Sequence, residues 1–170
     1  MGWLGRLLGR TGGSGSRYET QRSRALSLDP AGLQIPEGHW FGASVALMEI
    51  GRDAGTGTTS LVALADGTVS LYSSAGGGTT GAGQHLAVRE AAERFLQAAA
   101  DAAQSMTATS DFPLPGPGQV RFHVRTPAGD MTAGVPEALL RARRHQLGPL
   151  FVAGQDVMTE IRMLDEGRRG

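Results

Sequence analysis

The stretch TTSLVALADGTVSLY, residues 58–72, decides the fold class. Two runs rich in β-branched and apolar residues flank Asp66 and Gly67. Asp-Gly between such runs is the strongest short-range signal for a β-hairpin, because a type I′ turn needs positive φ at both central residues. We therefore expect an antiparallel hairpin with a type I′ turn at Asp66 and Gly67.

The rest of the chain supplies further strands and two amphipathic helices. Apolar runs and alternation predict strands over residues 44–50, 120–124 and 131–135, and apolar stripes predict helices over 84–106 and 148–164. Short connections make the strands antiparallel, and both helices need an apolar surface to cover. The expected fold is α+β: a single antiparallel sheet of about five strands, in the order β-β-β-α-β-β-α, with both helices packed on one face.

Composition narrows the class of protein. The chain has 170 residues, 40% of them hydrophobic, and no cysteine, so disulfides and thiolate zinc sites are excluded. No stretch approaches the roughly 18 apolar residues of a membrane span. Residues 1–24 also lack the apolar core of a secretory signal. We expect a cytoplasmic protein, with peripheral membrane association left open.

Charge divides the chain into two parts. Residues 1–24 carry five arginines against one glutamate, a net charge of +4, whereas residues 25–170 carry −4. Residues 11–16, TGGSGS, have the composition of a flexible linker. We expect a basic N-terminal arm and linker over residues 1–24 and a single α+β domain over residues 25–170. A basic arm on an acidic body indicates an anionic partner for the arm.

The first ten residues have the pattern of an amphipathic helix. The apolar side chains that share one helical face are Trp3, Leu4, Leu7 and Leu8, and the basic ones are Arg6 and Arg10. Interspersed glycines weaken such a helix in water by about 1 kcal/mol each. We expect residues 1–10 to become helical on an anionic membrane surface or in the groove of a protein partner. The alternatives are a tail without a binding role and a helix that docks on its own domain.

A glycine-rich loop precedes the first long helix and matches G-x-G-x-x-G. Its candidate anion-binding residues are Gly76, Gly77, Gly78, Thr79, Thr80 and Gly81. Glycine backbone N–H groups near a helix N-terminus can cradle an anion. Against this, the preceding strand belongs to a hairpin and no lysine completes a phosphate loop. The alternative is a connector in which Thr79 or Thr80 caps the helix.

A second candidate anion site lies on the strand expected at residues 120–124. Arg121, His123 and Arg125 project from one face of that strand, and guanidinium groups bind carboxylate and phosphate bidentately. The alternative is an ordinary solvated sheet face. If these side chains and the glycine-rich loop converged on one concavity, they would form an anion or nucleotide site.

Catalytic patterns are weak throughout. The four histidines are scattered, with no H-E-x-x-H motif, and there is no G-x-S-x-G nucleophile elbow. We assign no catalytic residue, no metal ligand and no cofactor, and the sequence favours a protein that is not an enzyme. The neutral total charge and the 5% aromatic content exclude a typical nucleic-acid-binding domain. Homo-oligomerisation is left open.

Three segments carry a resemblance: DGTVSLY with GGG (residues 66–72 and 76–78), FPLPGPGQVRF (112–122) and PLFVAGQ (149–155). In these the chain resembles a family of small, uncharacterised bacterial proteins, over about residues 40–164. The resemblance implies a domain boundary after the N-terminal arm and no known activity.

The sequence thus favours a non-enzymatic interaction or adaptor module, tethered through residues 1–10 to a protein partner or a membrane surface. The alternative is a small anion- or nucleotide-binding protein that uses the loop at residues 76–83 with Arg121 and Arg125.

Overall fold

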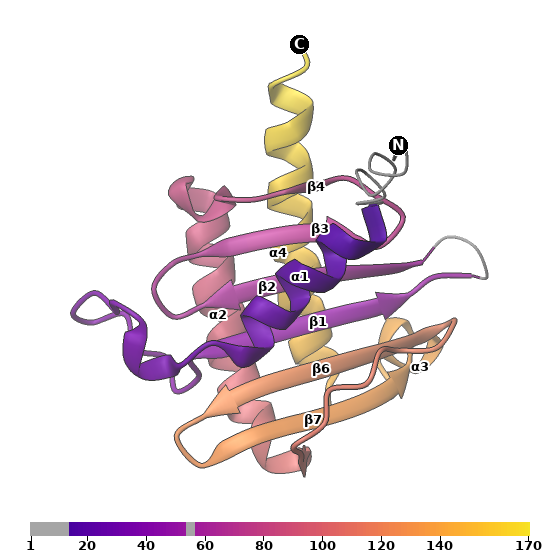
Figure 1. Cartoon of the computed structure of the whole chain (residues 1–170). Coiled ribbons are helices and arrows are strands. Elements are labelled where there is room, and N and C mark those ends of the chain that lie inside the picture. The colour runs from indigo at the N-terminus through magenta and orange to yellow at the C-terminus, as the bar shows by residue number, and fades with distance from the viewer. Residues whose placement is uncertain (1–13, 54–56) are drawn as a thin grey trace, which may run out of the picture.

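A computed structural model describes residues 14–53 and 57–170 of the chain (Figure 1). The α-helices of this part are α1 (Ser14–Ser27), α2 (Leu86–Ala102), α3 (Glu137–Arg141) and α4 (Gly148–Gly167). The strands are β1 (Val45–Gly51), β2 (Thr58–Leu64), β3 (Val69–Ser73), β4 (Gly78–Thr79), β5 (Thr107–Ala108), β6 (Gln119–Thr126) and β7 (Gly129–Pro136). Three short 3₁₀ helices lie at Pro30–Gly32, Ala82–Gln84 and Ala103–Ser105.

All seven strands form one antiparallel sheet, in the order β4-β3-β2-β1-β6-β7-β5. The α+β class with one antiparallel sheet therefore stands, but the expected number of about five strands is wrong. The two additional strands, β4 and β5, are two-residue edge strands. Two residues are too short to show the alternation by which strands are recognised in a sequence.

The β2–β3 hairpin is present, with a different turn from the one expected. Gly67 has a φ of +91°, whereas Asp66 does not have a positive φ, so the turn is not of type I′. Gly67 N–H donates to Leu64 O at 3.1 Å, and Leu64 N–H donates to Thr68 O at 2.9 Å. The Asp66 carboxylate accepts the Thr68 N–H at 2.9 Å. A longer connection with a single glycine in the left-handed region is the next most common hairpin after the two-residue turns.

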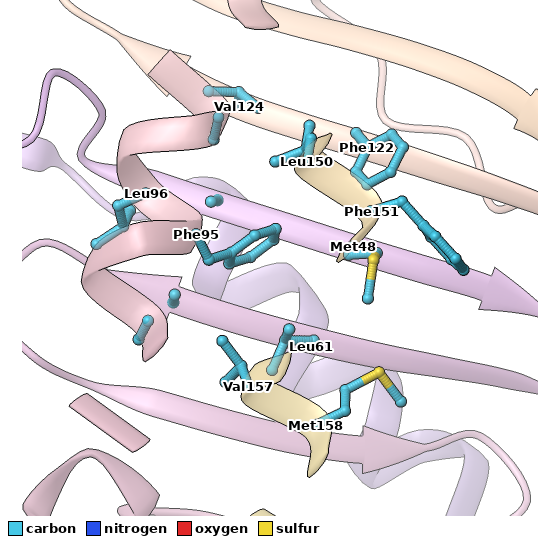
Figure 2. Close-up of a cluster of buried hydrophobic side chains, with 14 of the residues drawn as sticks. Met48, Leu61, Phe95, Leu96, Phe122, Val124, Leu150, Phe151, Val157 and Met158 are labelled. Atoms are coloured by element: carbon cyan, nitrogen blue, oxygen red, sulfur yellow. The ribbon is translucent and has the colours of Figure 1, made fainter. Parts of the chain in front are cut away.

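The main core lies between the sheet and helices α2 and α4, which lie together behind the sheet in Figure 1. Met48 and Leu61 from the sheet meet Phe95 of α2 and Val157 of α4 (Figure 2). Gly154 of α4 allows close packing, because a Cβ built there would lie 2.7 Å from the Met48 sulfur. This apolar layer fixes one face of the sheet and leaves the other face to α1.

Helix α1 crosses the opposite face of the sheet, in front of β1, β2 and β3 (Figure 1). Beneath it lies a second, smaller core that includes Tyr18, Leu47, Val62 and Tyr72. The rings of Tyr18 and Tyr72 pack edge to face, with their centroids 5.6 Å apart. The two expected helices, α2 and α4, pack on one face as predicted, and α1, which was not expected, covers the other face.

The position of α1 also bears on the expected arm and linker. Residues 14–16 of the expected linker belong to this helix, and the expected boundary between residues 24 and 25 falls inside it. Within the described residues, the part of the arm from Arg17 to Arg24 is thus an element of the fold. Residues 1–13 lie outside the described part of the chain.

Candidate functional site

Glu49 is the most unusual side chain in the described part of the sheet. It lies in β1, where Met48 and Ile50 face the main core and Leu47 and Glu49 face α1. Its relative exposure is 0%, although carboxylates are almost never fully buried unless they are paired. The charge must therefore be satisfied by protein groups around it.

Helix α1 provides the main partner of Glu49. Arg22 donates from Nε to Oε1 at 2.8 Å and from a terminal nitrogen to Oε2 at 2.7 Å, which is a bidentate ion pair. Tyr18, one helical turn earlier, donates its hydroxyl to Oε1 at 3.3 Å. Residues four apart share a helical face, so α1 presents both groups to one carboxylate.

The neighbouring strands complete the cluster around Glu49. Ser60, its cross-strand partner on β2, donates to Oε1 at 2.8 Å. On β6, His123 Nε2 lies 3.6 Å from Oε2, and its Nδ1 lies 3.0 Å from the Thr132 hydroxyl on β7. Phe112 covers the His123 ring edge to face, and its carbonyl accepts a hydrogen bond from Arg22 at 2.7 Å. We call Tyr18, Arg22, Glu49, Ser60 and His123 the Glu49 cluster.

The electrostatics of the Glu49 cluster favour the ionised carboxylate. Burial raises the pKa of Glu49, but interactions with His123, Arg22 and Ser60 outweigh it and lower that pKa from 4.5 to about 2. Burial, and then the negative charge of Glu49, raise the pKa of Tyr18 to about 12. At neutral pH the cluster therefore holds a permanent, shielded anion, which suits it to fix a cationic side chain.

Arg125 binds the C-terminal end of α1. Its guanidinium pairs with Asp130 at 2.6 Å and 3.2 Å. It also donates to the carbonyls of Leu26, at 2.6 Å, and Leu28. A guanidinium satisfies the free carbonyls at a helix C-terminus and interacts favourably with its dipole. Arg125 thus acts as a cap for α1.

The structure places the other residues of the expected anion site apart. The glycine-rich loop leads into β4 at one edge of the sheet, where Thr79 donates to Asp165 of α4 at 2.8 Å. Strands β3, β2 and β1 separate β4 from β6, which at about 4.8 Å per strand is about 19 Å.

Arg121 and the N-terminus of α2 give the loop no support as an anion site. Arg121 lies over Gly134 on β7, where an added Cβ would be 2.8 Å from its guanidinium. No side chain of the loop caps α2, whose N-cap is His85. The loop and the Arg121, His123 and Arg125 set therefore do not converge.

The candidate binding residues Trp3, Leu4, Arg6, Leu7, Leu8 and Arg10 lie outside the described residues. Within the described part of the chain, no helix is both long and apolar enough to cross a membrane. Among the same residues, no group of three His, Asp or Glu side chains could hold a metal ion.

A cleft of about 460 Å³ opens at the end of the sheet where the β2–β3 turn lies. One wall is the segment before β1, where His39 Nδ1 donates a hydrogen bond to the Glu93 carboxylate of α2 at 2.7 Å. The opposite wall is the β2–β3 turn with the segment from Gly81 to Gln84. Gly83 is pressed against this turn, because an added Cβ would lie 1.8 Å from Gly67 O. Only Gly81 of the expected anion site lines this cleft.

Comparisons with protein-family models, with curated proteins and with solved structures found no match. The resemblance to a family of small bacterial proteins therefore stays a prediction.

The Glu49 cluster was not among the sites expected from the sequence, yet two signals for it are present. A glutamate interrupts the otherwise apolar run at residues 45–50. Tyr18, Arg22, Ala25 and Leu26 also follow the i, i+4, i+7, i+8 spacing of a buried helical stripe, with arginine at one position. Opposite charges in two otherwise buried stripes, Glu49 in one and Arg22 in the other, indicate that the two side chains pair.

Proposed function

We propose that this protein is a non-enzymatic interaction module, recruited through residues 1–10 to a protein partner or to an anionic membrane surface. The observation that carries the proposal is the bidentate pair of Arg22 with the fully buried Glu49. It fixes the helix that directly follows the N-terminal segment, since only residues 11–13 separate the two. A surface that binds residues 1–10 would therefore hold the whole domain close to it.

The chemistry of residues 1–10 supports a recruiting role. Trp3 and the three leucines supply an apolar face, and Arg6 and Arg10 supply positive charge. Basic residues near an anionic membrane contribute about 1 kcal/mol each, which offsets the poor helix propensity of the interspersed glycines. A tryptophan suits the boundary between lipid and water.

The proposal gives the Glu49 cluster a structural role. Glu49 is covered by α1, and its pKa of about 2 leaves it without a proton to donate at neutral pH. General acid catalysis needs a group that keeps its proton at the working pH and reaches the substrate. Glu49 meets neither condition. Its hydrogen bonds with Tyr18 and Arg22 support a structural role, in which the cluster holds α1, and with it the recruiting segment, on the sheet.

The test compares the full chain with the double variant Trp3→Ala/Leu7→Ala. The matched control is Leu114→Ala/Leu139→Ala, which removes two exposed leucines outside the N-terminal segment. Each protein is sedimented with phosphatidylcholine vesicles that contain or lack phosphatidylserine, at low and high salt. A parallel pulldown at both salt concentrations identifies any protein partner.

Recruitment to a membrane predicts binding to the anionic vesicles only, which weakens with salt. Recruitment to a protein predicts capture of the same partner at both salt concentrations. In either case Trp3→Ala/Leu7→Ala abolishes the binding and the control variant keeps it. Identical behaviour of all three proteins in both assays would overturn the proposal.

A further inference from the structure

The cleft at the β2–β3 turn has the size and the lining of a small-molecule site. Its volume of about 460 Å³ falls within the range of roughly 300–1,000 Å³ that is usual for ligand pockets. Its apolar surface comes mainly from the partly exposed Phe41, and the buried side chains of Ala92 and Leu96 border it. Apolar lining with a few polar groups at the edge is the usual arrangement where small organic molecules bind.

The cleft has four ionisable side chains, and these differ in whether their polar atoms already have a partner in the protein. His39 and Glu93 are joined at 2.7 Å and satisfy each other. One carboxylate oxygen of Asp66 accepts the N–H of Thr68 within the turn. The Arg89 backbone N–H donates to His85 O at 3.0 Å within the helix, whereas its guanidinium forms no ion pair or hydrogen bond with any residue of the described ranges 14–53 and 57–170. Among the ionisable side chains of the cleft, the group left for a ligand is therefore the Arg89 guanidinium.

The surrounding charges decide which anion suits Arg89. A guanidinium binds carboxylate or phosphate through two parallel hydrogen bonds. Asp66 and Glu93 line the same cleft, so a phosphate with nearly two negative charges would meet two carboxylates and a single arginine. A carboxylate carries one negative charge, and its organic body can cover Phe41 and Leu96.

We propose that this cleft binds small organic carboxylates with an apolar body, with Arg89 holding the carboxylate and Phe41, Ala92 and Leu96 contacting the body. The site is independent of residues 1–10, so it adds a ligand to the proposed function without relying on it. Gly83 holds the two segments of one wall together, since its backbone is packed directly against Gly67.

The experiment titrates phenylacetate into the isotopically labelled full chain and follows the backbone amide signals by NMR. Phenylacetamide, the neutral analogue of the same shape, and inorganic phosphate serve as comparison probes. Arg89→Gln removes the proposed carboxylate ligand. Arg94→Gln is the matched control, because Arg94 is an exposed arginine of the same helix that does not line the cleft.

We expect phenylacetate to shift the amides of Gly67, Gly81 and Ala92 in a saturable manner. Phenylacetamide and phosphate should bind at least tenfold more weakly. Arg89→Gln should weaken phenylacetate binding about tenfold, as expected for hydrogen bonds to a charged group, and Arg94→Gln should leave it unchanged.

Four results would overturn the proposal. They are the absence of saturable shifts, shifts that map elsewhere on the sheet, equal affinities for phenylacetamide and phenylacetate, and equal effects of Arg89→Gln and Arg94→Gln on phenylacetate binding. Because Arg89 is exposed, its replacement does not disturb the core, and the amide spectrum of each variant confirms its fold.

Discussion

The two faces of the sheet differ in that the face covered by α1 contains a buried carboxylate, Glu49. Glu49 accepts hydrogen bonds from a helix and a neighbouring strand, and its charge is met by a bidentate arginine. Burying a charge costs free energy unless the charge is paired and hydrogen-bonded. Removing one partner of a buried pair leaves the other charge buried without compensation, which destabilises the folded state. The stability of this protein should therefore be unusually sensitive to Glu49.

Glu49→Gln should destabilise the protein by about 3 kcal/mol, because it leaves the mostly buried Arg22 without its counter-charge. Urea unfolding followed by circular dichroism measures the loss. The control is Glu93→Gln, which breaks the more exposed pair with His39 and should cost less than about 1 kcal/mol. Equal losses in the two variants would mean that the Glu49 pair is no stronger than a surface pair.

Acid should remove the contribution of Glu49. Its folded-state pKa of about 2 lies below the ordinary value of 4.5, so the unfolded chain binds more protons between these values. The contribution is therefore complete above about pH 5 and lost as the pH falls towards 2, with an upper bound of about 3 kcal/mol. Unfolding free energies of wild type and Glu49→Gln should converge over this window. A difference between them that stays constant from pH 7 to pH 3 would contradict the assigned pKa.

At the scale of elements, α1 and α4 are held on the sheet by different kinds of interaction. Helix α4 buries an apolar stripe that includes Leu150, Val157 and Ile161. Helix α1 packs Tyr18, Ala25 and Leu26 on a smaller core, and hydrogen bonds and charge hold it as well, from Tyr18 and Arg22 to Glu49 and from Arg125 to its C-terminal end. The buried stripe of α1 has helical spacing but includes the charged Arg22, so it differs from an ordinary apolar stripe, and α1 was not expected.

Strands and helices with strong local patterns could be predicted from the sequence, whereas contacts between distant segments could not. The strands at β1, β2, β3, β6 and β7 and helices α2 and α4 were expected close to their observed bounds. The alternative anion site required Arg121 and Arg125 to lie beside the glycine-rich loop, but the order of strands, which local sequence pattern does not fix, puts three strands between β4 and β6. The same limit hid the pairing of Arg22 with Glu49, which are 27 positions apart.

The β2–β3 turn provides a prediction at this scale. Gly67→Val should destabilise the protein by about 2 kcal/mol, because a β-branched residue is strained at the observed φ of +91°. The control is Gly32→Val, since Gly32 has no atom within 4 Å of an added Cβ and no positive φ. Thermal unfolding compares the two variants. A similar melting temperature for both would show that the turn does not need its glycine.

At the scale of the whole molecule, the two faces of the sheet have separate tasks. The face covered by α2 and α4 provides the main apolar core, and the face covered by α1 holds the smaller core and the Glu49 cluster (Figure 1). The cleft lies at the end of the sheet formed by the β2–β3 turn. The central claim is that the Glu49 cluster clasps α1 to the sheet, and local opening of the helix is the property that reports on this most directly.

The decisive measurement is hydrogen exchange of backbone amides by NMR in the full chain, comparing wild type with Glu49→Gln and with the control Glu93→Gln. The account predicts that in Glu49→Gln the amides of residues 22–26 in α1 lose protection by at least tenfold more than those of α2 and α4. In Glu93→Gln the protection of α1 should not change. Unchanged protection of α1 in Glu49→Gln, or an equal loss throughout the molecule, would contradict the claim that Glu49 clasps this helix.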